Sequence, residues 1–351
     1  MSRVVVVGGG IAGLAVASAL ARRGREVVLF ERQPQLGAGS SARSAAIFRL
    51  AVAEPVNVRL ALRAREIGRR LAPEGTVRAL GGFYLSDDSP ERQRILEAAG
   101  EAGVREARPG ELPGLLASRH RPALFSPDDG VIDVHALVHG LAREAKAAGA
   151  RLVLDTGVDT LTFEAGRVAG VRVGVEELSA EAVVDATGAW SPTFAPESDA
   201  GIHPHRRHLF VLDSPHASAF PNVVWDLTAN IYLRPESGGL LVSPCDETPM
   251  AGCDHVPTTP EAGSLLFEKL ASWAPALVNA TVRTVWAGLR PLTRDHRFVV
   301  GFDARLPGLF RLGGFGGHGM TAGAAAGELA AALLCGDDPP DARELQPNRF
   351  G

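Results

Sequence analysis

Residues 3–31, RVVVVGGGIAGLAVASALARRGREVVLFE, decide the fold of this chain. The valine run at 4–7 is typical of a strand that is buried on both faces. A G-x-G-x-x-G turn at residues 8–13 leads into an alanine- and leucine-rich helix, and a second strand at 27–30 ends in Glu31. Strand, glycine turn, helix, strand and acidic residue in this order predict a Rossmann dinucleotide-binding unit.

The small and acidic residues of this unit each suit one part of a dinucleotide. Gly8 allows the tight turn, and Gly10 lets a pyrophosphate approach the backbone. Gly13 lets the helix pack close to the sheet, with its positive N-terminus facing the phosphates. Glu31 stands where such units accept the adenosine ribose hydroxyls. We therefore expect an adenine dinucleotide here; the alternative is a glycine-rich turn that binds nothing.

Length and composition indicate a globular protein of two domains. The 351 residues exceed the usual size of one hydrophobic core. Hydrophobic residues make up 46% and charged residues 22%, which is an ordinary balance for a globular chain. The net charge of −4 gives no electrostatic footprint for nucleic acid or an anionic membrane, so neither is expected as a partner.

Cysteine usage and the first apolar run suggest the compartment. Cys245, Cys253 and Cys335 are odd in number and form no CxxC pair, so they predict no disulfide framework and favour a reducing environment. The run at 4–7 is too short for a signal peptide or a transmembrane segment. We expect a cytoplasmic protein.

The rest of the chain alternates between helical and extended patterns. Between residues 203 and 286, short apolar runs alternate with Pro, Asn, Asp and Gly, which predicts an antiparallel sheet that forms a wall over the cofactor. Residues 112–121 favour a linker. Helices are expected at 54–72, 90–100, 134–148 (with Asp133 as N-cap), 260–273 and 321–334, and strands at 82–85, 151–154, 161–163, 168–175, 182–190 and 310–312.

Three further stretches suit the dinucleotide site. Residues 36–46, LGAGSSARSAA, are small or hydroxyl-bearing, so a ligand can approach their backbone, and Arg43 suits a phosphate or a ribityl chain. The strand predicted at 182–190 brings residues 187–188 to the carboxyl edge of the sheet, where open α/β sheets bind ligands. Residues 313–320, GGFGGHGM, form a second glycine-rich turn that opens a helix and again suits an anion.

The chain carries further motifs in a definite order: ARSAA at 42–46, GVID at 130–133, DATGAW at 185–190, IYLRP at 231–235, WAGLRP at 286–291 and GGHGM at 316–320. With residues 3–31 they resemble the D-amino-acid oxidase (DAO) superfamily of FAD enzymes over nearly the whole chain. The sequence is most similar to bacterial D-amino-acid dehydrogenases of the D-arginine type, and glycine and sarcosine oxidases are close behind.

The resemblance implies an α/β fold of the glutathione-reductase-like DAO type, in which a Rossmann-like FAD-binding domain carries a second, antiparallel-sheet substrate domain. The expected FAD-binding domain is discontinuous and comprises residues 1–75, 131–200 and 290–351. The expected substrate-binding domain comprises residues 76–130 and 201–289.

The resemblance also implies catalytic roles for three side chains. An arginine matching Arg290 clamps the substrate carboxylate in this family, a task that suits a planar guanidinium. A tyrosine matching Tyr232 donates a second hydrogen bond to that carboxylate. His318, at the turn before the last helix, either assists or merely packs. The structural alternatives are an ion pair for Arg290 and a half-buried strand aromatic for Tyr232.

FAD is the cofactor that the resemblance implies, and it should be non-covalent. Monomeric sarcosine oxidases attach FAD to a cysteine in the region matching 290–295, where this chain has none. The expected FAD-binding residues are Gly8, Gly10, Ile11, Ala12, Gly13, Glu31, Arg32, Ser40, Ser41, Arg43, Ser44, Val158, Thr187, Gly188, Trp190, Gly314, Gly316, Gly317, His318, Gly319, Met320 and Thr321.

The substrate pocket departs in detail from that of the D-arginine-type enzymes. They carry a histidine and a threonine where this chain has residues 39–41, and a tyrosine in place of His318. Arg206 or Arg207 is a candidate to enter the pocket. The histidines at 135, 139, 203, 205 and 208 and the pair Cys253 and His255 show no set of three or four converging ligands, so no metal site is expected.

The expected function is FAD-dependent oxidation of a small-molecule amino acid or secondary amine. A hydride would pass from the α-carbon to flavin N5, and water would hydrolyse the imine. The alternatives are a FAD enzyme acting on a 2-hydroxy acid or in biosynthetic tailoring, and a flavin-binding partner protein without turnover. The electron acceptor is a quinone, a dye or oxygen. Because sarcosine oxidases place a lysine where residues 240–242 are apolar, we favour a dehydrogenase that reacts poorly with oxygen.

Overall fold

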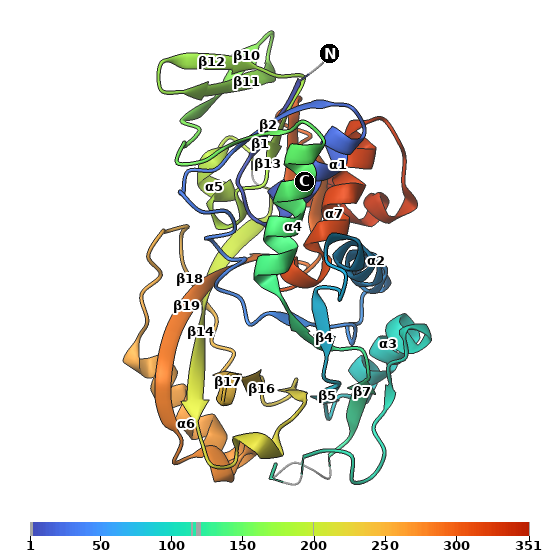
Figure 1. Ribbon diagram of the computed structural model, residues 1–351, viewed down its shortest axis with the longest axis vertical. Coiled ribbons are helices and arrows are strands. Elements are labelled where there is room, and N and C mark those ends of the chain that lie inside the picture. Colours follow the sequence, from blue (N-terminus) through green and yellow to red (C-terminus); the bar gives the residue numbers. More distant parts are fainter. Residues whose placement is uncertain (1–2, 114, 117–120, 199, 351) are drawn as a thin grey trace.

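A computed structural model describes residues 3–113, 115–116, 121–198 and 200–350. Figure 1 shows an elongated molecule in which an α/β layer structure occupies one end and a broad, largely antiparallel sheet occupies the other. This is the α/β architecture with a second sheet that the sequence predicts. None of the helices in the described ranges is long and apolar enough to cross a membrane.

The first sheet holds the valine run at its centre. Its strand order is β20-β21-β13-β1-β2-β9, and all neighbours are parallel except β20 and β21. The valines alternate: Val4 and Val6 pack against helices on one face, while Val5 and Val7 pack against a small sheet on the other. The strands are β1 (Arg3–Val7), β2 (Glu26–Phe30), β9 (Arg151–Val153), β13 (Ala182–Asp185), β20 (Val299–Phe302) and β21 (Leu309–Gly313).

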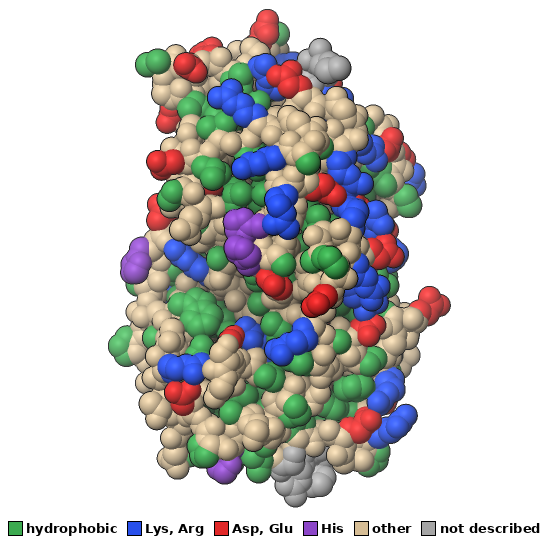
Figure 2. Space-filling model, in the orientation of Figure 1, with side chains coloured by type: hydrophobic (Ala, Val, Ile, Leu, Met, Phe, Trp, Pro, Cys, Tyr) green, Lys and Arg blue, Asp and Glu red, His purple; other side chains and the backbone are tan. Residues whose placement is uncertain are grey.

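Four helices cover or flank one face of this sheet: α1 (Ile11–Arg22), α2 (Pro55–Leu71), α4 (Val134–Ala147) and α7 (Gly319–Leu334). Small residues let α1 and α7 approach closely, because a Cβ at Gly327 would lie 2.4 Å from Ala15 Cβ. The predicted N-cap Asp133 accepts a hydrogen bond from Ala136 N at 2.8 Å. Figure 2 shows basic and acidic side chains interspersed over these helices, where Arg22, Arg63 and Arg70 pair with Glu144 and Glu328.

The other face of the first sheet carries the antiparallel strands β10 (Thr160–Glu164), β11 (Arg167–Val173) and β12 (Glu176–Ser179). The sequence predicts the first two as a hairpin and misses the third. A further small sheet of β3 (Ile47–Phe48), β8 (Gly130–Ile132) and β4 (Val77–Ala79) joins the two ends of the molecule.

The large sheet has the order β18-β14-β17-β16-β15-β5-β7-β6, and β19 pairs with the opposite edge of β14. Its helix α6 (Pro260–Trp273) packs on one face through Leu266 and Leu270. The face that carries Leu209, Trp225 and Tyr232 is directed at the first sheet. The strands are β5 (Gly82–Leu85), β6 (Arg105–Glu106), β7 (Ala123–Ser126), β14 (Ile202–Asp213), β15 (Val223–Asp226), β16 (Ile231–Glu236), β17 (Gly239–Ser243), β18 (Thr248–Pro249) and β19 (Thr281–Thr293); α3 (Ser89–Ala99) follows β5.

Several predicted boundaries differ from the structure. The strand predicted at 182–190 ends at Asp185, because its carboxylate accepts hydrogen bonds from the backbone and hydroxyl of Thr187 and turns the chain. Pairing of β5 with β15 is parallel, so the large sheet is not wholly antiparallel. Strand β19 runs to Thr293, so the domain boundary expected at 289/290 falls within this strand and stays a prediction. The linker predicted at 112–121 falls partly outside the described residues.

Candidate active site

A cavity of about 560 Å³ lies between the carboxyl ends of β1 and β13 and the inner face of the large sheet. Two predicted site residues do not line it: Gly13 lies behind the turn, and a Cβ at Gly314 would lie 2.6 Å from Thr293 Cγ2, so that glycine serves packing. The predicted residues that do line it are Gly8, Gly10, Ile11, Ala12, Glu31, Arg32, Ser40, Ser41, Arg43, Ser44, Val158, Thr187, Gly188, Trp190, Tyr232, Arg290, Gly316, Gly317, His318, Gly319, Met320 and Thr321.

The first glycine turn combines tight packing with one open position. Gly8 has φ +109°, and a Cβ there would lie 2.5 Å from Ala186 O. A Cβ at Gly13 would lie 1.9 Å from Gly8 O, so the start of α1 can close on the turn only because that residue is glycine. At Gly10 the nearest atom to an added Cβ is Ser41 Oγ at 3.5 Å, which leaves its backbone open to the cavity.

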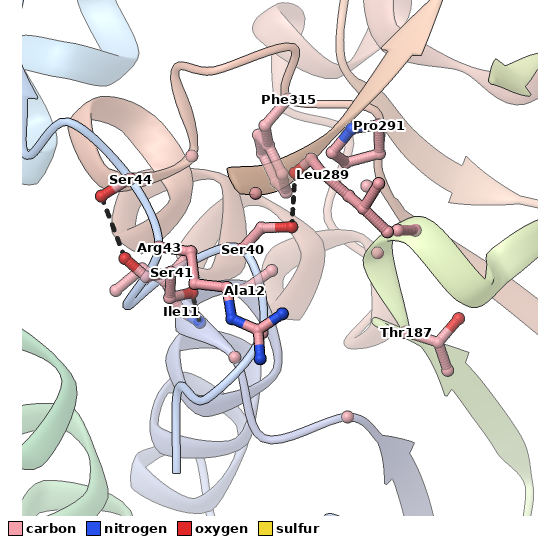
Figure 3. A pocket seen from close by; sticks show the side chains of 18 of the residues that line it. Ile11, Ala12, Ser40, Ser41, Arg43, Ser44, Thr187, Leu289, Pro291 and Phe315 are labelled. Atoms are coloured by element: carbon pink, nitrogen blue, oxygen red, sulfur yellow. Dashed lines mark hydrogen bonds between the residues drawn. The ribbon is translucent and has the colours of Figure 1, made fainter. Parts of the chain in front are cut away.

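The loop after β2 lines the cavity beside the α1 N-terminus, as Figure 3 shows. Ser41 Oγ accepts a hydrogen bond from Ile11 N at 3.1 Å. Ser44 Oγ donates to Ser41 O, and Ser40 Oγ donates to Leu289 O at 2.7 Å, which ties this loop to β19. The loop is therefore held by its own hydroxyls.

Glu31 is fixed by the turn that it faces. Its two carboxylate oxygens accept hydrogen bonds from Gly9 N at 2.6 Å and Gln33 N at 2.9 Å. A carboxylate has about four lone-pair sites, so oxygen lone pairs stay free for a ligand hydroxyl at the cavity wall. Arg32 lies beside it with its guanidinium 4.2 Å from the centre of the Trp190 ring.

A buried ion network orders the segment after β13. The Arg311 side chain is 1% exposed, and it donates to Asp185 at 2.7 Å and to Asp303 at 2.8 Å. Asp185 also accepts from Thr187 and from Ser191 Oγ at 2.5 Å. Every partner in this network is hydrogen-bonded, so no buried charge is left unpaired. The network therefore positions residues 187–190 along the cavity.

The second glycine turn places a neutral histidine at the cavity. His318 precedes α7, and its Nε2 atom is buried without a hydrogen-bond partner in the described chain. Burial, helped by the charges of Arg49 and Arg290, lowers the pKa of His318 to about 3. The imidazole is therefore uncharged at neutral pH.

Arg290 and Tyr232, for which the resemblance predicts contacts with a substrate carboxylate, are both available for a ligand. No hydrogen bond or ion pair joins the Arg290 side chain to any described residue, and the Tyr232 hydroxyl is buried without a partner. Gly317 has φ +101°, and a Cβ there would lie 3.0 Å from Arg290 Cζ, so glycine makes room for the guanidinium. Burial, followed by the charge of Arg207, lowers the pKa of Arg290.

Of the two alternative arginines, Arg207 lines the cavity and Arg206 does not. Arg207 is 4% exposed; its Nε donates to Asp246 O at 2.5 Å and its Nη2 donates to Glu247 at 2.9 Å. Its Nη1 has no partner among the described residues. The side chain of Arg206 instead reaches Pro257 O.

One cation that lines the cavity, Arg49, has no role predicted from the sequence. Arg49 follows β3, and its guanidinium carbon lies 4.9 Å from the Tyr84 ring centre and 4.5 Å from the Trp225 ring centre. Its Nε donates to Ala51 O at 2.8 Å. Only the pairing of β5 with β15 brings the two rings together, so no local sequence pattern could indicate this site.

The other histidines and cysteines do not form a metal centre in the described ranges, where no group of three or more His, Cys, Asp or Glu could hold an ion. His208 is instead structural: its Nδ1 faces Asp246 at 2.7 Å, and its Nε2 accepts from Thr259 N at the start of α6. All three cysteines are free thiols.

Comparison with known proteins gives a family match over most of the chain. The profile of the FAD dependent oxidoreductase family (DAO) matches residues 3–333. The glycine oxidase of Geobacillus kaustophilus is 27% identical over 358 residues, which cover 94% of this chain and 92% of that protein. The D-amino acid dehydrogenase of Rhizobium johnstonii is 29% identical over 232 residues, 65% of this chain.

Solved structures agree with this match. The crystal structure of L-proline dehydrogenase from P. horikoshii has a TM-score of 0.88 at 26% identity and covers 99% of this chain and 97% of that one. The chain spans only about half the length of several curated relatives. They include the D-amino acid dehydrogenase (55%) and subunit A1 of an anaerobic glycerol-3-phosphate dehydrogenase from Haloferax volcanii (54%), which is 28% identical over 82% of this chain.

Proposed function

Because the chain belongs to the DAO family of FAD-dependent oxidoreductases, we propose that it oxidises the carbon–nitrogen bond of an amino acid or secondary amine to an imine. Two electrons and two protons leave the substrate, and water then converts the imine to an oxo acid and the free amine. The glycine oxidase and D-amino acid dehydrogenase relatives support this choice of bond.

The residues at the cavity fit FAD. The backbone at Gly10 is open, Glu31 keeps free lone pairs, and the α7 N-terminus meets the cavity at a second glycine turn. These groups suit a pyrophosphate, a ribose and the polar edge of a flavin, respectively. Bound FAD supplies the two-electron acceptor.

The observation that carries the proposal is the pair of free donors at Arg290 and Tyr232. A half-buried guanidinium and a fully buried phenol that have no partner among the described residues are costly unless a ligand satisfies them. A carboxylate accepts from both, and Arg290 binds it through two parallel N–H groups. This clamp fixes the α-carbon of the substrate, while neutral His318 adds no positive charge against the amine.

Anaerobic reduction tests the proposal. The FAD-loaded protein is mixed with a panel of D- and L-amino acids, glycine, N-methylglycine and proline, and flavin absorbance near 450 nm is followed. We expect bleaching by at least one amine and formation of the matching oxo acid. Lactate, malate and glycerol 3-phosphate are the alcohol controls, and bleaching by these alone would contradict the proposal.

A further inference from the structure

The substrate end of the cavity carries more positive charge than one carboxylate can neutralise. Arg49, Arg207 and Arg290 all line it, and of these only Arg207 has a carboxylate partner among the described residues, Glu247. The acidic lining residues lie elsewhere. Glu31 is bound to the first glycine turn, Asp254 pairs with Arg32, and Asp159 accepts from Gly174 N. Positive side chains therefore gather at the substrate end of the cavity, away from the acidic lining residues.

The donors near Arg290 are enough to saturate one carboxylate. Arg290 offers two parallel N–H groups, Tyr232 offers its hydroxyl, and Arg207 offers the unpaired Nη1. A carboxylate accepts about four hydrogen bonds in all. The buried carboxyl of Asp129 interacts electrostatically with Arg49, but the terminal nitrogens of Arg49 form no hydrogen bond or ion pair with any described residue, so they are left over for another group.

Arg49 belongs to a second location rather than to the same cluster. Arg290 is on β19, whereas Arg49 lies over Trp225 of β15 and Tyr84 of β5, and β14, β17 and β16 lie between β19 and β15 in the large sheet. The charges of both arginines lower the pKa of His318, which also lines the cavity. Across the sheet, Trp225 and Tyr232 are paired in register with ring centres 4.6 Å apart, and Arg49 lies over Trp225.

The Arg49 guanidinium is also held in place before any ligand binds. Two adjacent rings support its face, and the bond from Nε to Ala51 O fixes its orientation. The Arg49 side chain lines the cavity. An arginine that is ordered by stacking loses little freedom when it binds an anion, because its planar fork is already oriented.

We propose that Arg49 binds a second anionic group of the substrate, so that the compound oxidised here is an amino or imino dicarboxylic acid. This substrate class rests on the proposed function. The first carboxylate binds Arg290 and Tyr232, the second binds Arg49, and the carbon–nitrogen bond lies between them over the aromatic floor of Trp225 and Tyr232.

Matched acid and amide substrates test the substrate class. Aspartate is compared with asparagine and glutamate with glutamine, in both enantiomers, and iminodiacetate with N-methylglycine, by anaerobic stopped-flow reduction. The acid and amide pairs differ mainly in one negative charge, whereas N-methylglycine lacks the second carboxylate of iminodiacetate altogether. We expect the acid to be favoured by about tenfold or more in reduction rate constant divided by Kd.

Substitutions test the assignment to Arg49. Arg49→Met removes the charge and keeps an unbranched chain over the rings, so reduction by the acid should fall by about tenfold more than reduction by the amide. Arg49→Lys should keep part of the preference. Arg206→Met is the matched control, because Arg206 precedes Arg207 on β14 and points outside the cavity. An acid preference that survives Arg49→Met would overturn the role of Arg49.

Inert ligands separate this inference from the proposed function. Succinate and glutarate are titrated against succinamate and glutaramate, with perturbation of the flavin spectrum as the readout, so no turnover is needed. Tighter binding of the dianions that is lost in Arg49→Met supports the second anion site even if no amine bleaches the flavin. Equal binding of dianions and monoanions, or equal reduction by acids and amides, overturns the inference while amine oxidation stands.

Discussion

Arg290 is the residue whose loss should damage the reaction most selectively. It makes no bond to a described side chain, so Arg290→Ala removes only the ligand contact proposed for it and leaves the surrounding hydrogen bonds intact. We expect a loss of roughly 3–5 kcal/mol in substrate binding or transition-state stabilisation, the range for removing one partner of a desolvated charge pair. FAD content should not change. Single-turnover reduction by the best substrate measures the effect.

The control for Arg290 lies on the same strand. Arg283→Ala removes an exposed arginine near the other end of β19, where it pairs with Asp213 at 3.2 Å, and should leave reduction unchanged. Normal affinity and rate in Arg290→Ala would place the carboxylate clamp elsewhere.

Asp129 is a buried carboxyl whose titration should be visible in stability. It accepts hydrogen bonds from Tyr84, Leu50 N and Ser126 Oγ, and burial raises its pKa to about 6 despite these bonds. A raised pKa means that the folded protein binds the proton more tightly than the unfolded chain. The resulting stability is present below pH about 4 and is lost as the pH rises through about 6.

Replacing Asp129 with asparagine isolates this titration. Between pH 4 and 7 the wild type should lose up to about 3 kcal/mol of stability relative to Asp129→Asn, which has no proton to release. Denaturant midpoints of both proteins, measured with saturating FAD, provide the comparison. A difference between the two midpoints that does not vary with pH would show that the carboxyl is ionised throughout.

Among the elements, the first glycine turn and α1 depend most on the absence of a side chain at Gly13. A Cβ at Gly13 would lie 1.9 Å from Gly8 O, and a β-branched side chain would push the helix away from the turn. Gly13→Val should therefore abolish FAD binding, as measured by absorbance of the purified protein and flavin released on denaturation. Gly100→Val is the control, since that position has φ −59° and no neighbour within 4 Å. Full flavin content in Gly13→Val would exclude this turn from the FAD site.

The sequence predicts the elements that depend on residues close to one another in the chain. The first strand, turn and helix follow from the periodicity and glycine spacing of residues 3–31, and all but two of the predicted site residues line one cavity. Arg49 escapes prediction because its supporting rings come from β5 and β15, which are distant in sequence. The strand at 182–190 is overestimated because the side-chain bonds of Asp185 stop it, and apolar periodicity does not report such bonds.

At the scale of the whole molecule, the positions of the two lysines affect which electron acceptor we expect. Lys146 is exposed on α4, and Lys269 on α6 donates to Asn230 O and Pro244 O, so neither lines the cavity. The cations at the substrate end, Arg49, Arg207 and Arg290, are arginines that we expect to be occupied by substrate or product. Oxygen reduction begins with formation of an anion that a free positive charge stabilises.

We therefore expect oxygen to be a slow acceptor while product is bound. Stopped-flow mixing of substrate-reduced protein with air-saturated buffer should give reoxidation slower than turnover with a quinone or dye. Reoxidation that keeps pace with turnover, with one peroxide formed per substrate, would show that this protein is an oxidase.

The close approach of α1 and α7 has a consequence for biosynthesis. Gly327 lies against Ala15, and Arg311 on β21 holds Asp185, so elements from opposite ends of the described chain complete the cavity proposed for FAD. A ribosome releases the glycine turn of residues 8–13 long before it makes β21 and α7. Contacts of such long sequence separation form late and slowly. The first helix of the nascent chain must therefore wait for α7 without its packing partner. We expect flavin binding to be one of the last events of folding.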